Sequence, residues 1–157
     1  MELLLWRHAE AEDAAIGQPD LKRSLTRKGK NQARRIADWL REHRPAALRI
    51  LVSPAERCQQ TARALALPYD IEARLGTSAD VADILSAAGW EDGSDNAESA
   101  VLLVGHQPTL GRLAAFLLSG EEADWNVKKG ALWWFSSRPR EGGTEAILRA
   151  VIAPDLV

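Results

Sequence analysis

The sequence has one cysteine, no long apolar run and no strong net charge, and each of these shortages excludes a class of protein. Cys58 has no second cysteine to pair with among the 157 residues, so an internal disulfide and a cysteine-rich zinc site are both excluded. No apolar run approaches the length of a secretory signal or a membrane span. We therefore expect a soluble, cytoplasmic protein with no membrane partner.

Positive and negative charges nearly cancel, because the chain has 20 basic and 22 acidic residues and a formal net charge of -2. The field of the whole molecule therefore does not attract nucleic acid, and we expect no nucleic-acid partner. Any preference for anions must be local. The basic tract KRSLTRKGKNQARR at residues 22–35 predicts a solvated helix face, because apolar residues at helical spacing bury the opposite face. Docking of an acidic phosphoprotein is the second interpretation of this tract.

The chain length and the apolar pattern predict one domain spanning residues 1–157. Short apolar or β-favouring runs indicate strands at 2–6, 49–53, 101–105, 131–136 and 146–152. Apolar positions at helical spacing lie between them, at 33–40, 81–88 and 110–117. We find no repeat, and the polar stretch 91–99 is the one segment that we expect to be disordered.

Alternation of buried strands with amphipathic helices predicts an α/β fold, a three-layer α/β/α sandwich around a mostly parallel sheet. No helix separates the last two strands, so we expect an antiparallel edge there. Ser53, Pro54 and Glu56 have the spacing of an N-cap, a first-turn proline and a capping-box partner, which predicts a helix over 54–66.

Four cationic or imidazole side chains follow the predicted strands. Arg7 and His8 come directly after the first strand, Arg57 lies in the first turn of the helix after the second, and His106 follows the third. Ligands of open α/β sheets bind at the carboxyl ends of the strands, so we expect these side chains to share one rim. No carboxylate or cysteine stands among them at a metal-ligand spacing, so we expect an anion, best a phosphate, and neither a metal nor a cofactor.

Three motifs in this order, RHA (7–9), SPxxRxxQTA (53–62) and GHxP (105–108), resemble the histidine phosphatase superfamily, whose members are phosphoglycerate mutase-like. The short chain and the segment RSLTRKGKNQA (23–33) narrow the resemblance to the small SixA-type branch of phosphohistidine phosphatases. The match spans about residues 1 to 120. Ala9 departs from the pattern, because the larger family usually carries glycine there.

The resemblance implies that His8 is the nucleophile and that Arg7, Arg57 and His106 surround the phosphoryl group. It also implies that Arg23 is a further phosphate-binding arginine. A neutral imidazole is a competent nucleophile near pH 7, provided that a hydrogen bond to a partner such as a backbone carbonyl holds its other nitrogen. His106, when protonated, would add a third positive group. The expected enzyme is a metal-independent phosphatase that passes through a phospho-His8 intermediate.

The substrate follows from the leaving group. A substrate imidazole leaves with a conjugate-acid pKa of about 6.5, so it needs much less help from an acid than an alkoxide does. Larger relatives carry a carboxylate acid that we cannot assign here, so phosphohistidine on a protein, such as a phosphotransfer domain, is the expected substrate. Glu10, Glu12 and Asp13 keep open the alternative of a small-molecule phosphomonoesterase. A non-catalytic, phosphate-dependent binding module is the second alternative.

Cys58 followed by Arg63 raises the possibility of a cysteine phosphatase. The spacing is one residue shorter than in that loop, and the segment is predicted to be helical. We therefore expect Cys58 to be a packing residue.

Overall fold

A computed structural model describes residues 1–90, 100–141 and 143–157. Its six strands form one sheet and are β1 (Glu2–Arg7), β2 (Arg49–Val52), β3 (Asp70–Ile71), β4 (Ala100–Gly105), β5 (Leu132–Arg140) and β6 (Gly143–Ile152). The α-helices are α1 (Arg27–His43), α2 (Glu56–Arg63), α3 (Val81–Ala88) and α4 (Thr109–Ser119). Short 3-10 helices are η1 (Asp20–Lys22), η2 (Ala73–Leu75) and η3 (Pro154–Leu156). The predicted disordered stretch 91–99 lies outside the described residues.

The sheet has the strand order β3-β2-β4-β1-β5-β6. Strands β3, β2, β4 and β1 are parallel neighbours, whereas β5 is antiparallel to both β1 and β6. The prediction of a mostly parallel sheet with antiparallel pairing at one edge is therefore confirmed. β1 lies inside the sheet, between β4 and β5, and the sheet is covered on both faces, which explains why residues 3–6 are all apolar and fully buried.

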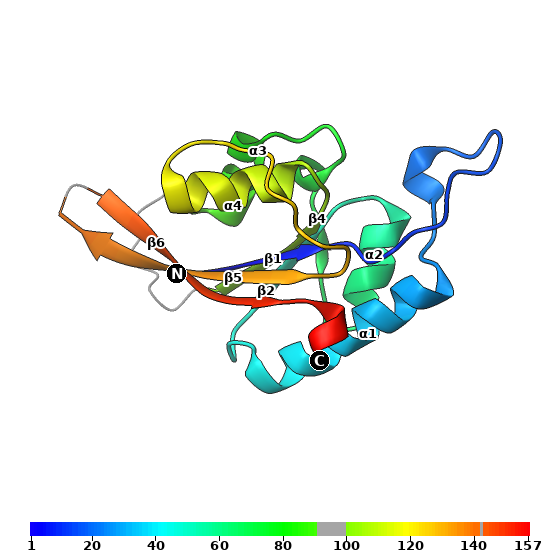
Figure 1. The fold of residues 1–157 in the computed structure, drawn as a ribbon, viewed down its shortest axis with the longest axis horizontal. Coiled ribbons are helices and arrows are strands. Elements are labelled where there is room, and N and C mark those ends of the chain that lie inside the picture. The colour runs from blue at the N-terminus through cyan, green and yellow to red at the C-terminus, as the bar shows by residue number, and fades with distance from the viewer. Residues whose placement is uncertain (91–99, 142) are drawn as a thin grey trace.

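Helices cover both faces of the sheet, as the predicted three-layer sandwich requires (Figure 1). α1 and α2 pack on one face, against alternate side chains of the strands such as Leu4 and Trp6. α3 and α4 pack on the other face, against the intervening side chains such as Leu3 and Leu5. The same alternation places Trp133 and Trp134 on opposite faces of β5.

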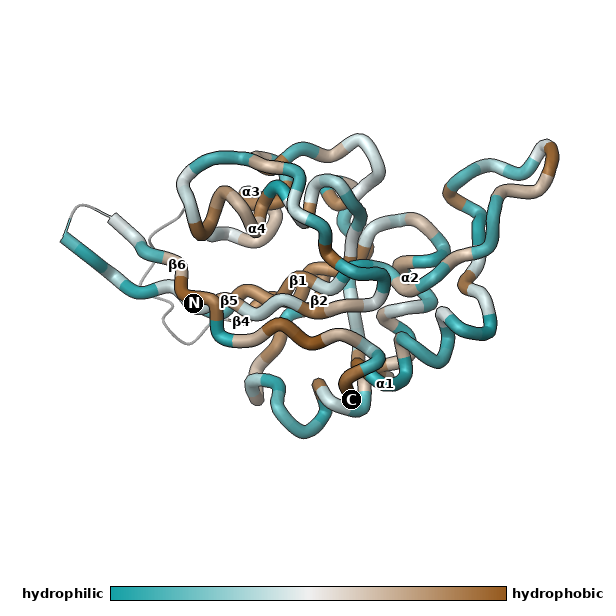
Figure 2. Tube along the Cα trace, in the orientation of Figure 1, coloured by the Kyte–Doolittle hydropathy of each residue, from teal (hydrophilic) through white to brown (hydrophobic). Residues whose placement is uncertain are grey.

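The hydropathy of the chain follows these layers (Figure 2). The central strands are apolar, whereas α1 is largely hydrophilic, because its apolar residues form one narrow buried stripe through Ala33, Ile36 and Leu40. No helix among the described residues is both long enough and apolar enough to cross a membrane.

Two local predictions need correction. α2 spans Glu56–Arg63 and not 54–66, and its N-cap is Ala55, with no side-chain cap hydrogen bond. Ser53 lies two residues before this N-cap, and its hydroxyl accepts from Ala55 N at 3.3 Å and lies 2.8 Å from His106 Nε2. The two-residue strand β3 was not predicted from the sequence, because two residues carry no readable periodicity.

Gly29 allows α1 to approach the segment that leaves β1. Thr26 caps α1 by accepting a hydrogen bond from the Gly29 backbone amide at 2.9 Å, and its own amide donates to Glu10 O at 3.0 Å. A Cβ atom at position 29 would lie 1.9 Å from Glu10 O, which is far inside contact distance. The bare backbone at Gly29 therefore sets the position of α1 beside residues 8–10.

Substituting Gly29→Ala should lower the free energy of unfolding by about 2 kcal/mol, because a clash with backbone outweighs the better helix propensity of alanine. Urea denaturation would measure the change. Lys30→Ala, at the exposed next position of α1, is the control and should be close to neutral. An equally stable Gly29→Ala protein would contradict this account of the contact.

Candidate active site

The carboxyl ends of β1, β2 and β4 bring the predicted site residues to one edge of the sheet. Backbone hydrogen bonds continue the parallel pairing beyond the strands, from His8 N to Gly105 O at 3.1 Å and from Ser53 N to Val104 O at 3.0 Å. The residues that follow these strands are therefore held in register. The ring centroids of His8 and His106 lie 5.3 Å apart.

The orientation of His8 depends on main-chain atoms. Its Nδ1 lies 2.8 Å from Ala9 O, and a carbonyl oxygen can only accept, so Nδ1 carries the proton and Nε2 carries the lone pair. The predicted hydrogen bond from the ring to a backbone carbonyl is thus present. Gly130 N donates to His8 O at 3.2 Å and so holds the peptide group between His8 and Ala9 in place. Nε2 is the nitrogen left for chemistry.

His8 is neutral at pH 7 in this environment. Burial of the ring lowers the pKa of His8 to about 4, and the charges of Arg57 and Arg7 act in the same direction, against the hydrogen bond to Ala9. The neutral ring has the lone pair that a nucleophile needs.

Arg57 extends from the first turn of α2 and is almost wholly buried, with 3% of the residue exposed. Its Nη1 donates to Asp20 O and its Nη2 donates to an Asp20 carboxylate oxygen, both at 3.0 Å. Nη2 also lies 3.4 Å from His106 Nδ1. A guanidinium only donates, so Nδ1 of His106 is the acceptor and carries no proton.

His106 is therefore neutral, and the condition for a third positive group, a protonated His106, is not met in this structure. The pKa of His106 is lowered to about 3, mainly by burial and in part by the neighbouring His8 and Arg57. With Nδ1 unprotonated, Nε2 carries the proton and donates to Ser53 Oγ. Ser53 is thus a positioning residue that we mistook for a helix cap.

Both arginines keep a donor unused. Arg7 Nη1 donates to Val127 O at 2.6 Å, and burial lowers the pKa of this guanidinium. Within the described residues, Arg7 Nε and Arg57 Nε are buried and have no hydrogen-bond partner. A buried donor without a partner is destabilising. Arg44 Nε is also without a partner in the described residues, but of these three arginines only Arg7 and Arg57 line the hollow, where their Nε atoms are available to an acceptor such as a phosphoryl oxygen.

These side chains line one open hollow of about 260 Å³. Its walls are formed by Arg7, His8, Ala11, Asp13, Arg23, Arg57, Thr77, His106, Gln107 and Lys129. All five predicted site residues are among them. The sequence did not single out Ala11, Thr77, Gln107 or Lys129. Gln107 is the variable position of the GHxP motif, and Thr77 and Lys129 lie in turns.

Arg23 lines the hollow and shares a carboxylate partner, Asp20, with Arg57. The sequence did not single out Asp20. Asp20 accepts from Arg23 Nε at 2.9 Å and from Arg57, so one carboxylate joins both arginines. Burial alone would raise the pKa of Asp20, but the hydrogen bonds from Arg23 and Arg57 hold it below its usual value. Asp20 therefore stays ionised and serves as a counter-ion, not as a proton donor.

The carboxylates considered as general acids lie in different environments. Glu10 accepts from the Thr26 hydroxyl at 3.0 Å, and this hydrogen bond is the main reason that its pKa is lowered. An ionised Glu10 cannot donate a proton. Asp13 lines the hollow and is the one of the three that the structure places there.

Two further residues of the SPxxRxxQTA motif hold the site together. Thr61 is fully buried, accepts from Ala9 N at 3.1 Å and donates to Arg57 O at 2.7 Å. Gln60 accepts from Leu25 N at 2.6 Å. The motif itself contains these residues, so its spacing was the signal for them.

Cys58 is a packing residue, as predicted. It is fully buried, and burial raises the pKa of its thiol to about 12, so no thiolate forms at pH 7. In the described part of the chain, no three His, Cys, Asp or Glu side chains are grouped so that they could hold a metal ion.

Comparison with known proteins agrees with this geometry. A match to the histidine phosphatase superfamily (branch 1) covers residues 3–78. The phosphohistidine phosphatase SixA of Escherichia coli is 34% identical over 128 residues, which are 77% of this chain and 76% of that protein. The phosphohistidine phosphatase SixA homolog of Haemophilus influenzae is 30% identical over 133 residues, covering 74% of this chain and 77% of its own.

A solved structure extends the similarity to nearly the whole fold. The structure of the protein histidine phosphatase SixA complexed with tungstate superposes with a TM-score of 0.79 at 28% identity and covers 99% of both chains. The chain therefore belongs to the histidine phosphatase superfamily, in its SixA-type branch.

Proposed function

We propose that this phosphatase removes the phosphoryl group from phosphohistidine on a protein, without a metal ion, through a phospho-His8 intermediate. One observation carries the proposal. A neutral His8 with an available Nε2 shares a hollow with Arg7 and Arg57, and each arginine holds a buried Nε without a partner among the described residues. This arrangement suits attack on phosphorus by a ring nitrogen while guanidinium groups take up the phosphoryl oxygens.

In the first step the lone pair of His8 Nε2 attacks phosphorus. The substrate ring carries a proton on its other nitrogen, so when its phosphorus–nitrogen bond breaks the electron pair goes to that ring, which leaves as a neutral imidazole. Water then attacks phosphorus, the bond to Nε2 breaks, its electron pair returns to His8, and dihydrogen phosphate leaves with both protons of the water. The Nδ1 proton stays on the His8 ring, hydrogen-bonded to Ala9 O, so the ring is neutral before attack, formally cationic in the phospho-His8 intermediate and neutral again afterwards.

The residues support a nitrogen leaving group. Glu10 and Asp20 are held ionised, so neither is available as the acid that an alkoxide requires. The relatives that are named phosphohistidine phosphatases favour the same substrate class. A phosphotransfer domain is one protein of this kind. The hollow is open, which would admit a histidine displayed on a protein surface.

The ester alternative depends on Asp13, since it is the candidate acid that lines the hollow. The binding-module alternative needs no free Nε2 on His8. The experiments below separate these alternatives from the proposal.

With chelator present, the wild-type protein should hydrolyse a phosphohistidine protein with a kcat/KM at least about a hundredfold above that for p-nitrophenyl phosphate, because the imidazole leaves without an acid. His8→Ala should lower kcat at least about a thousandfold. Release of inorganic phosphate would be followed for both substrates. Rapid acid-free quenching with labelled substrate should trap label on wild-type protein and none on His8→Ala.

Asp13→Asn provides the matched control for the substrate class. The proposal expects phosphohistidine turnover within about twofold of wild type. If ester turnover equals phosphohistidine turnover and is lost in Asp13→Asn, the enzyme is a phosphomonoesterase. Binding of phosphate without turnover of either substrate would support the binding module instead.

Arg57→Ala should lower kcat/KM for the phosphohistidine protein about a hundredfold, because one preorganised donor to the phosphoryl group is lost. Arg63→Ala is the control, since Arg63 lies on the same helix but points to Glu56, 2.9 Å away at the surface. Equal effects of the two substitutions would remove Arg57 from the proposed phosphoryl site.

Both site histidines of the free protein should remain mostly neutral at pH 5.5. Their pKa values are lowered to about 4 and about 3, below the 6.5 of an unfolded histidine. The unfolded chain then binds more protons between about pH 4 and 6.5, so acidification through this window should reduce stability. Proton NMR of the ring C–H signals, assigned with His8→Ala, measures the titration, and a midpoint near 6.5 for either ring would contradict the assignment.

A further inference from the structure

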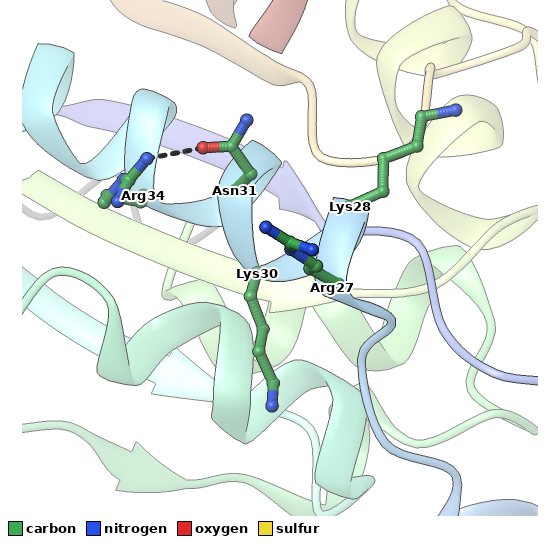
Figure 3. Close-up of a pocket in the computed structure, with 5 residues that line it drawn as sticks. All are labelled: Arg27, Lys28, Lys30, Asn31 and Arg34. Carbon is green, nitrogen blue, oxygen red and sulfur yellow. Dashed lines mark hydrogen bonds between the residues drawn. The ribbon is translucent and has the colours of Figure 1, made fainter.

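The first half of α1 concentrates positive charge on a chain whose net charge is -2. Residues 27–35 contain five cations and no acidic residue, and the first acid of the helix is Asp38. Four of these cations form what we call the α1 basic face, namely Arg27, Lys28, Lys30 and Arg34 (Figure 3). Together with Asn31 they line a hollow of about 830 Å³.

Within the described residues, two members of the α1 basic face have neither an ion pair nor a side-chain hydrogen bond. These are Arg27 and Lys30, and both are exposed. Lys28 lies 3.4 Å from Glu10, and Arg34 donates to the side chain of Asn31 at 2.6 Å. Among the described residues, most of the positive charge of the α1 basic face is therefore not neutralised by an acidic partner.

Helix electrostatics make this placement unfavourable for the isolated protein. The N-terminus of a helix carries a partial positive charge, which favours acids and disfavours cations in the first turn. α1 has no acid in its first turn and has Arg27, Lys28 and Lys30 at its start. The Lys28–Glu10 ion pair and the Thr26 cap offset part of this cost, but Arg27 and Lys30 have no partner among the described residues, and such a broken local rule points to a function.

The α1 basic face connects to the catalytic hollow. Glu10 lies two residues after His8 and pairs with Lys28. The positive charge of Lys129 helps to lower the pKa of Glu10. Lys129 lines the catalytic hollow. Lys28 also lines a second hollow, of about 300 Å³, together with Lys128. Positively charged side chains are thus found all the way from the hollow around His8 to the start of α1.

We propose that the α1 basic face, together with Lys129, is a docking surface for acidic side chains that lie near the phosphohistidine of the protein substrate. The proposal rests on the phosphohistidine phosphatase function proposed above. An acidic protein surface fits better than a nucleic acid, because the proposed substrate is itself a protein and because the chain as a whole, with a net charge of -2, does not attract a long polyanion. Residues 27–34 also span only about 12 Å of helix, which is short for a row of phosphates.

The test compares three phosphohistidine probes of the same wild-type enzyme. These are free phosphohistidine, a peptide whose phosphohistidine is flanked on both sides by Glu and Asp, and the same peptide flanked by Ser and Gly. The test variant is Arg27→Glu/Lys30→Glu. The matched control is Arg138→Glu/Arg140→Glu, which makes the same change in net charge on the β5–β6 ribbon at the opposite end of the sheet (Figure 1).

We expect Arg27→Glu/Lys30→Glu to lower kcat/KM for the acidic peptide about tenfold, through KM, and to leave the other two probes within about twofold. The control variant should change none of the three. Raising the salt concentration should remove the advantage of the acidic peptide in the wild type. Thermal unfolding is the check on folding, because acids at the start of α1 should leave the variant at least as stable as the wild type.

The outcomes separate the two proposals. Hydrolysis of all three probes with no selective loss in Arg27→Glu/Lys30→Glu overturns the docking surface and leaves the phosphatase proposal standing. Hydrolysis of none by the wild type overturns the phosphatase proposal and the docking surface with it. Unchanged kinetics together with double-stranded DNA binding that the variant loses would assign the face to nucleic acid. If the test variant unfolds, Arg27→Gln/Lys30→Gln repeats the comparison with a smaller expected loss.

Discussion

The burial of Arg57 is the constraint on which the rest of the site depends. A guanidinium that is 3% exposed needs partners inside the protein, and it finds them in Asp20 and in His106 Nδ1. The same charge helps to keep the rings of His106 and His8 unprotonated. One donor, Nε, is left without a partner in the described part of the chain. The buried cation thus favours two neutral imidazole rings and leaves an incomplete hydrogen-bond shell at the same place, and an anionic acceptor would complete that shell.

The polar positions of SPxxRxxQTA have separate structural roles. Ser53 holds His106, Arg57 contributes the buried charge, Gln60 binds the backbone of Leu25, and Thr61 joins Ala9 to the backbone of Arg57. Positions 57, 60 and 61 are three and four residues apart, so they share one face of α2. A single helix therefore positions segments that follow β1, β2 and β4.

Much of the fold could be predicted because the strands are buried on both faces and the helices are amphipathic. The carboxyl ends of the parallel strands meet, so the sequence predicts that Arg7, His8, Arg57 and His106 lie together, and the family resemblance adds Arg23. The contact of the Ser53 hydroxyl with His106 could not be predicted, because it joins two segments far apart in the sequence. Asp20 and Lys129 were missed, since they lie in connecting segments whose paths no periodicity encodes.

The contact between His8 and Ala9 O has a consequence for how the site tolerates change. Among the described residues, the hydrogen-bond partner of the His8 ring is a main-chain carbonyl and not a side chain. Side chains around the hollow can therefore differ in size or charge, and so alter what enters, while the same ring nitrogen keeps the proton. The structure separates what the hollow admits from which nitrogen of His8 has the lone pair.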